Sequence, residues 1–380
     1  MKKILLPAFS LFASVLAVQA QASAPTNLMV MRLGGVGQSL ATSGNTMNLD
    51  EYTTTGTLVS TVVIPSSGTN AFICGGTSAT EGYISLSANG KYLVWAGYNT
   101  NYGWASTSLS TSSGAAVARG VATLDGYGNY ALAFTGNVES GSSIRGGVSD
   151  GLGNFWIEGG VTGIIYVGNN GPLATVSTST ANERCLNIFN GNLYYSTGSA
   201  AGTSPGLGLW EVPGLPTTAG GNNVNTNDGV QFGTTSPEDF VVNPTAGLAY
   251  LCDDDASTAG GGIIRYKLTG GIWVSNYTIS TGSSGAYSVV ANFSGANPVL
   301  YATVGGTSVS AGNTLVSITD TGSNSTPGAI AVAPAGYTFR GLSWAPGAYP
   351  LITNQPASGT NDYTQTSVLS VGVEGTAPFG

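Results

Sequence analysis

One pattern of charge, strand and turn recurs along the sequence, and this recurrence restricts the possible folds more than any other feature. A charged residue opens a short apolar or small-residue run, a turn containing Gly or Asn follows, and an aromatic-rich run comes next. The clearest copies start at Glu81, Arg145, Arg184 and Asp239, a looser copy starts at Ala286, and a half-copy surrounds Arg340. Self-similarity at a period of about 40–50 residues indicates stacked structural repeats.

Each copy predicts a β-hairpin followed by further strands, which together make a four-stranded antiparallel unit. One such unit cannot bury both of its faces, whereas radial packing of several units does so and leaves only short edges. The sequence therefore predicts an all-β protein with a single β-propeller over residues 25–348. A β-helix would show a shorter and stricter period, and a β-sandwich would not need the recurrence.

The two ends of this region predict how the ring closes. The segment from Asn27 reads as outer strands without an inner hairpin, and the half-copy around Arg340 reads as an inner strand without outer ones. Together they would form one shared blade, which avoids an open sheet edge. Counting the opening segment with the repeat starts gives seven blades, give or take one, and residues 99–116 are expected to form an extra Ser/Thr-rich loop.

Residues 1–20 read as a secretory signal peptide. Lys2 and Lys3 precede an apolar run over 4–18, and Ala20 stands at a small-residue cleavage site. An uncleaved membrane anchor is the alternative, although the run is short beside the ~20 residues of a membrane span. We expect export to the cell surface or beyond, with no membrane span in the mature chain.

Composition excludes several classes of protein. Only 7% of residues are charged, but 42% are hydrophobic, which is too many for a disordered chain. The net charge is −8 and no cluster of cations is present, so binding to nucleic acid or to anionic lipid is not expected. Histidine is absent, which excludes Ser-His-Asp and Cys-His catalysis and every zinc site that contains His.

The three cysteines, Cys74, Cys185 and Cys252, are far apart and each lies in or beside an apolar strand. They have no metal-ligand spacing. We expect buried thiols, since Cys packs as a small hydrophobe. One disulfide with a leftover thiol is the alternative, because the exported compartment permits it.

The charged repeat starts are the first candidate site, a ring around the propeller axis at the channel mouth. This predicted charge ring consists of Glu81, Arg145, Arg184, Asp239 and Arg340. As a binding site it would be a polar funnel for a small or saccharide ligand. The alternative interpretation is inter-blade ion pairing that fixes the blade register, since buried charges are normally paired.

Asp253, Asp254 and Asp255 form the only acidic cluster, and hard cations take several oxygen ligands. Calcium is therefore a candidate ligand, and no other cofactor is expected. Adjacent carboxylates at a strand end point in different directions, however, so a solvated turn is the alternative.

Aromatic residues near turns suggest a third candidate, a platform on which sugars stack. Tyr98, Tyr102 and Trp104 lie in or beside the extra loop, where we expect them to be exposed. Trp95 and Trp156 stand within strands and are expected to be inter-blade core.

The region from about Asn27 to Pro346 resembles a family of exported bacterial β-propeller proteins of largely unassigned function. The segments that carry the resemblance are NLDEYTTTGTLV, EGYISLSANGKYLVWAGY, VARGVATLDGYGN, IRGGVSDGLGNFWIEGG and FRGLSWAP. The resemblance implies large surface or secreted proteins with immunoglobulin-like repeats, and it supplies no catalytic residues.

The tail, residues 349–380, resembles the first strands of such an immunoglobulin-like module, preceded by a linker. Alternation at Leu369, Val371 and Val373 is typical of a half-buried strand. Because an immunoglobulin-like sandwich needs ~100 residues, we expect a longer protein whose second domain is cut within this chain.

These features favour a non-catalytic secreted or cell-surface module for adhesion or binding, with an extracellular glycan or a surface protein as the partner. A polysaccharide-acting enzyme is the first alternative, and it would need two carboxylates in one cleft, for which Glu81 and Asp239 are the only candidate pair. A structural surface-layer or filament subunit is the second, and it would need no concave polar pocket.

Overall fold

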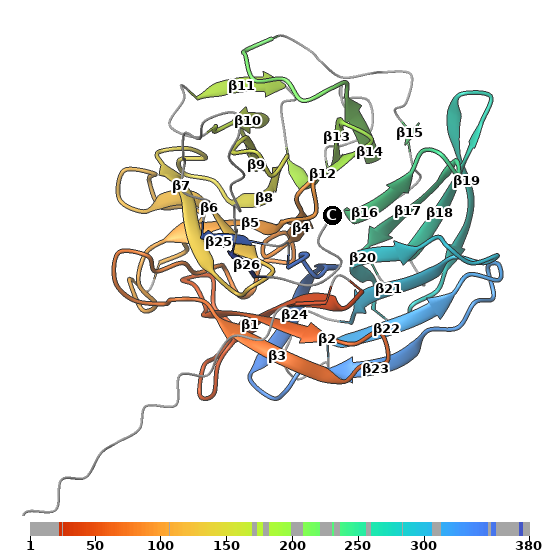
Figure 1. Ribbon diagram of the computed structural model, residues 1–380, viewed down its shortest axis with the longest axis horizontal. Helices are drawn as coiled ribbons and strands as arrows, with labels where there is room; N and C mark the ends of the chain where they lie inside the picture. The colour runs from red at the N-terminus through yellow and green to blue at the C-terminus, as the bar shows by residue number, and fades with distance from the viewer. Residues whose placement is uncertain are drawn as a thin grey trace, which may run out of the picture.

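Six four-stranded antiparallel sheets surround a common centre, as the blades of a β-propeller (Figure 1). The structure, a computed structural model, describes residues 23–24, 26–105, 107–168, 173–177, 182–198, 208–220, 230–231, 236–255, 260–282, 284–305, 313–348, 351–354 and 372–374. Short alternating or fully apolar runs separated by Gly, Asn and Ser turns form the strands, as their composition predicts.

The blades follow one another around the ring, and their strands are given from the inside outward. Blade 1 contains β24 (Tyr337–Trp344), β1 (Leu28–Gly34), β2 (Met47–Tyr52) and β3 (Leu58–Val63). Blade 2 contains β4 (Ile84–Leu86), β5 (Tyr92–Asn99), β6 (Ala118–Asp125) and β7 (Tyr130–Gly136). Blade 3 contains β8 (Ile144–Ser149), β9 (Phe155–Gly159), β10 (Ile164–Tyr166) and β11 (Ala174–Ser177).

The second half of the ring repeats this order. Blade 4 contains β12 (Glu183–Phe189), β13 (Asn192–Thr197), β14 (Gly208–Val212) and β15 (Val230–Gln231). Blade 5 contains β16 (Pro237–Asn243), β17 (Leu248–Asp253), β18 (Gly262–Thr269) and β19 (Ile272–Ile279). Blade 6 contains β20 (Ala286–Asn292), β21 (Val299–Val304), β22 (Thr314–Thr319) and β23 (Gly328–Val332).

The propeller has six blades, so the prediction of seven is wrong. The opening segment and the half-copy around Arg340 were counted as separate blades, but they form one. β24 pairs antiparallel with β1, from Leu28 opposite Trp344 to Gly34 opposite Tyr337. The predicted closure by both chain ends is confirmed, and the extra loop lies between β5 and β6 of blade 2 as predicted.

A β-bulge occurs near the start of the inner strand in five blades. The pairing register shifts at Arg145 in β8, at Arg184 in β12, beside Asp239 in β16, at Tyr287 in β20 and at Arg340 in β24. A bulge leaves a residue out of the ladder and turns its side chain away from the regular face. Four of the five charged repeat starts thus share a backbone irregularity, whereas Glu81 precedes β4, whose pairing with β5 shows no register shift.

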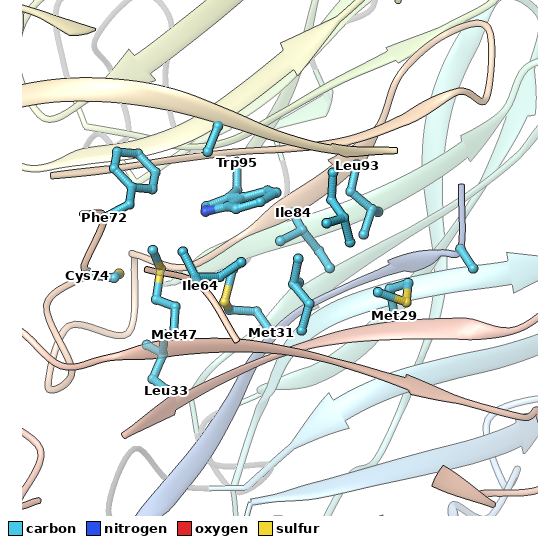
Figure 2. Close-up of a cluster of buried hydrophobic side chains, with 14 residues drawn as sticks. Met29, Met31, Leu33, Met47, Ile64, Phe72, Cys74, Ile84, Leu93 and Trp95 are labelled. Atoms are coloured by element: carbon cyan, nitrogen blue, oxygen red, sulfur yellow. The ribbon is translucent and has the colours of Figure 1, made fainter. Parts of the chain in front are cut away.

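Buried apolar side chains fill the space between neighbouring blades. Figure 2 shows one such cluster, in which Met31 and Leu33 of β1 face Ile84, Leu93 and Trp95 of blade 2. Two faces of each sheet are covered in this way, so the blades stabilise one another.

Single residues within these cores agree with the sequence-based expectations. Trp95 and Trp156 are fully buried, as expected for core aromatics. Cys74, Cys185 and Cys252 are all buried and free, which confirms the prediction of buried thiols.

Beyond the propeller, β25 (Leu351–Asn354) and β26 (Gly372–Glu374) pair antiparallel. Leu369 and Val371 lie outside the described residues, and the immunoglobulin-like assignment stays a prediction, as does the signal peptide, whose residues 1–20 also lie outside them. Within the described part of the chain, no helix has the length and apolar character needed to cross a membrane.

A methyl group at Gly341 is expected to destabilise the contact between blades 1 and 2. A Cβ built there would lie 2.5 Å from the backbone nitrogen of Ile84 and 2.6 Å from the carbonyl oxygen of Gly82. We expect Gly341→Ala to lower the free energy of unfolding by about 1–3 kcal/mol, as overpacking does. Gly328→Ala is the control, because its Cβ would meet nothing closer than 3.7 Å. Equal urea midpoints for the two variants would contradict this account of the blade contact.

Candidate functional site

Charged side chains gather at one end of the propeller axis. We call this end, where the inner strands β4, β8, β12, β16, β20 and β24 begin, the upstream face, and the opposite end the downstream face. Nine of the 18 acidic residues lie at this face and interact electrostatically with one another or with neighbouring groups. They are Glu81, Glu139, Glu158, Glu183, Glu238, Asp239, Asp253, Asp254 and Asp255. Such a concentration, in a chain with 7% charged residues, marks the upstream face as the candidate site.

The bulged arginines each reach toward the next blade. Arg340 of blade 1 donates hydrogen bonds to the carbonyl oxygens of Gly76, at 3.1 Å, and Ser78, at 3.2 Å, in the segment that leads into blade 2. Arg145 of blade 3 donates to Asn182 Oδ1 at 2.6 Å and to the carbonyl oxygen of Glu183 at 2.7 Å, where blade 4 begins. These contacts connect blades through backbone carbonyls.

Arg184 continues this pattern with an ion pair. Its Nη1 contacts Glu238 Oε1, which links blade 4 to blade 5. Burial raises the pKa of Glu238 to about 8, while the charge of Arg184 acts in the opposite direction. This contact is an ion pair between blades, which is the kind of contact that the alternative interpretation of the charge ring predicts.

Tyr83 reaches from blade 2 to blade 5 at the upstream face. Its hydroxyl donates to Glu238 Oε2 at 2.5 Å, which joins blade 2 to blade 5. Between blades 1 and 6, the guanidinium of Arg340 lies 5.7 Å from the ring centre of Tyr287. The open polar space at this face therefore lies to one side of the axis.

That space is a cavity of about 270 Å³ beside the start of blades 2 and 3. It is lined by Thr42, Gly75, Thr77, Ser78, Thr80, Glu81, Ser108, Ser110, Ser143 and Arg145. Glu81 and Arg145 are two members of the predicted charge ring, and the other lining side chains are hydroxyls. Among the described residues, Nη2 of Arg145 has no hydrogen-bond partner, because its bonds use Nε and Nη1.

Glu81 is held firmly in the wall of this cavity. Its Oε2 accepts a hydrogen bond from the backbone nitrogen of Gly75 at 2.9 Å, and its Oε1 accepts one from the hydroxyl of Tyr98 at 3.2 Å. Burial raises its pKa, and these donors together with Arg145 oppose the rise. The carboxyl group is thus fixed in place in the cavity wall.

Asp239 lies elsewhere, although the sequence paired it with Glu81. Its carboxyl oxygens accept hydrogen bonds from the thiol of Cys185 at 2.9 Å, from the hydroxyl of Ser288 and from the backbone nitrogen of Phe240 at 2.7 Å. Burial raises its pKa to about 6. It lines a separate cavity among the inner strands, so the two carboxylates face no common cleft.

Glu158, at the end of β9, is a residue that the sequence analysis missed. Both of its carboxyl oxygens are buried without a hydrogen-bond partner. Burial raises its pKa well above the ordinary value, repulsion from Glu183 adds to this, and Arg145 opposes it. A lone acidic residue inside the aromatic run FWIEGG was the available signal, since such a strand is expected to be buried.

The predicted aromatic platform is only partly at the surface. Tyr98 is fully buried, so its predicted exposure is wrong. It lies at the end of β5, where the guanidinium of Arg119 covers its ring at 5.2 Å. Tyr102 and Trp104, further into the loop, are 43% and 37% exposed.

Asp253, Asp254 and Asp255 come together at the end of β17. Each offers an oxygen within 4.8 Å of the others, so these adjacent carboxylates do not point apart as expected. Asp253 is buried, and its Oδ1 accepts a hydrogen bond from the backbone nitrogen of Asp255 at 2.9 Å. Calcium stays a prediction for this group.

Comparisons with known proteins show the fold. The sequence matches no protein-family model and no curated protein. A chain in the crystal structure of a nidogen/laminin complex is similar, with 11% identity and a TM-score of 0.50, over 84% of this chain and 98% of that one. The periplasmic gluconolactonase of Pseudomonas aeruginosa has 11% identity and a TM-score of 0.41, with 80% of this chain and 82% of that chain covered.

A third similar structure is the extracellular domain of a protein described as a hybrid two component system from B. thetaiotaomicron. It has 12% identity and a TM-score of 0.39, and the match covers 82% of this chain and 34% of that chain. The likeness to the chain of the nidogen/laminin complex supports the β-propeller fold and, at 11% identity, no activity.

Replacement of Glu158 by Gln is expected to make stability less dependent on pH. The folded protein keeps the proton on this group as pH rises, whereas the unfolded chain releases it near pH 4.5, so Glu158 costs stability increasingly above that pH. The variant should match the parent protein at pH 5 and unfold at a midpoint higher by about 2 °C or more at pH 8. Parallel stability curves for the two proteins, measured by calorimetry, would show that Glu158 is not a buried acid.

Calcium is expected to raise the thermal unfolding midpoint if the acidic group at β17 binds it, because a ligand of the folded state stabilises that state. Millimolar calcium should shift the midpoint of the parent protein and leave the double variant Asp254→Asn, Asp255→Asn unchanged. Magnesium is the control ion. An identical response of both proteins to calcium would rule out this site.

Proposed function

We propose that this chain is a non-catalytic binding module of the cell exterior, and that the upstream cavity takes a hydroxyl-rich ligand of the saccharide class. The observation that carries the proposal is the cavity lining itself, in which seven Ser or Thr residues surround Glu81 and Arg145. The signal-like residues 1–20 and the resemblance to exported propellers support the location, which places extracellular glycans within reach.

The chemistry of the lining suits sugar hydroxyl groups. A Ser or Thr hydroxyl both donates and accepts hydrogen bonds, a carboxylate accepts, and a guanidinium donates from a rigid fork. A sugar ring offers hydroxyls of both kinds around its rim. Nη2 of Arg145, which has no hydrogen-bond partner among the described residues, adds a donor that also suits the carboxylate of an acidic sugar.

The size of the cavity restricts the ligand. Its volume of about 270 Å³ is just below the ~300–1,000 Å³ of pockets that enclose drug-sized ligands. A single terminal sugar therefore suits the space better than an internal stretch of polysaccharide.

The two alternative functions receive less support from the geometry. A glycosidase of the two-carboxylate type needs both groups on one substrate, but Glu81 and Asp239 line different cavities. A purely structural subunit has no need for a concave polar pocket, and this face has one. The likeness to a chain of a nidogen/laminin complex is compatible with a binding role and supports no particular partner.

The experiment is a glycan array with the parent protein and with Thr77→Trp, followed by calorimetry on each glycan bound. Thr77 is an exposed residue of the cavity lining, so the large ring should fill the space without disturbing the core. Binding should fall at least tenfold in Thr77→Trp and persist in the control Thr77→Ser. Glycan binding with the same affinity in Thr77→Trp would show that the binding site is not the upstream cavity. The absence of binding to any glycan on the array would contradict the proposal.

A further inference from the structure

The downstream face carries a second and larger cavity, on the opposite side of the propeller from the proposed glycan site. It has a volume of about 580 Å³ and lies between blades 1 and 6. It is lined by Thr26, Asn27, Thr53, Thr54, Leu86, Ala291, Asn292, Phe293, Tyr301 and Trp344. We call it the downstream cleft.

The downstream cleft combines aromatic rings with amide and hydroxyl groups. Trp344 at the end of β24 is half-buried, and its ring meets that of Tyr301 edge-on at 5.7 Å, so its orientation is fixed by packing. Asn292 beside it is exposed, and Asn27 and Thr54 are half-buried. An aromatic wall with polar groups at its rim suits a ring that has an apolar face and hydroxyls at its edge.

A smaller and mainly apolar cavity adjoins this cleft, among the inner strands that surround the propeller axis. Its volume is about 230 Å³, and it shares two lining residues, Leu86 and Trp344, with the downstream cleft. Inner strands of five blades surround it, and their apolar lining residues are Ile84, Ile188, Phe189, Phe240, Val241, Val289, Val290 and Leu342. We call it the axial channel.

Asp239 is the charged residue that lines the axial channel, and both of its carboxyl oxygens already accept hydrogen bonds from protein groups. Oδ1 accepts from Cys185 and from the backbone nitrogen of Phe240, and Oδ2 accepts from Ser288. Neither oxygen requires a polar ligand group. Ser87, Asn187 and Ser343 also line the channel, but apolar residues form most of its wall. This mainly apolar lining favours a hydrocarbon occupant over ordered water.

We infer that the downstream face binds an amphipathic molecule, whose hydroxyl-bearing head lies in the downstream cleft and whose hydrocarbon tail enters the axial channel. The shared walls at Leu86 and Trp344 are where head and tail would join. A volume of 230 Å³ equals roughly eight times the ~30 Å³ share of a water molecule, and a methylene group is of similar size, so the tail is limited to about eight carbons.

The first test is calorimetry with alkyl glucosides of increasing chain length, kept below the concentrations at which they form micelles. Affinity should rise by up to roughly fourfold for each methylene added, as burial of hydrocarbon predicts, and should level off near eight carbons. Glucose alone and octanol alone should each bind more weakly than octyl glucoside. Affinity that does not depend on chain length would overturn the role of the axial channel, and equal binding of octanol would overturn the role of the cleft.

Variants then test the place of binding. Ala88, an exposed residue in the turn after β4, lines the axial channel, so Ala88→Trp should obstruct it and reduce octyl glucoside binding at least tenfold. Leu152→Trp is the matched control, because Leu152 is 81% exposed in the corresponding turn after β8 and lines neither cavity. Equal affinities of these two variants would contradict the proposed path of the tail.

A second pair of variants tests the head. Trp344→Ala should weaken the binding of octyl glucoside more than Trp104→Ala does. Trp104→Ala is the control, because it removes an exposed Trp from the loop of blade 2. Thermal midpoints establish that each variant is folded. The upstream variant Thr77→Trp should leave the dependence of alkyl glucoside affinity on chain length unchanged, so failure of this inference and failure of the proposed function are distinguishable.

Discussion

Each sheet of this protein depends on its neighbours, because its apolar side chains are buried only when another sheet covers them. The clusters between blades, such as the one around Met31 and Trp95, supply this burial around the whole ring. The ring is continuous only because β24 joins β1, so residues from the two ends of the propeller share one sheet. Both proposed binding sites exist because that closure brings the inner strands together.

Charge at the upstream face follows from the same architecture. Bulges at the start of the inner strands turn Arg145, Arg184 and Arg340 out of the ladders, and a buried guanidinium needs partners. Two of these arginines use carbonyl oxygens of the next blade, and Arg184 uses Glu238. One of these arginines, Arg145, thereby also lines the upstream cavity.

The recurrence in the sequence was sufficient to predict the propeller and its closure, because equivalent residues perform the same packing in each blade. The predicted blade number was wrong, since the count included both the segment from Asn27 and the half-copy around Arg340, although the two were expected to share one blade. Tyr98 was misplaced because a residue at a strand end looks like a loop residue in sequence. The downstream cleft was missed because Trp344, Asn27 and Tyr301 are brought together only by the three-dimensional fold.

Amide hydrogen exchange at β1 and β24 tests the shared blade most directly. If these strands close the ring, peptides covering Leu28–Gly34 and Tyr337–Trp344 should be as protected as the inner strands of the other blades. They should also lose that protection together, in the same opening event as the rest of the propeller. Rapid, independent exchange of the Tyr337–Trp344 peptide would show that the end of the chain is not part of the ring and would contradict the account.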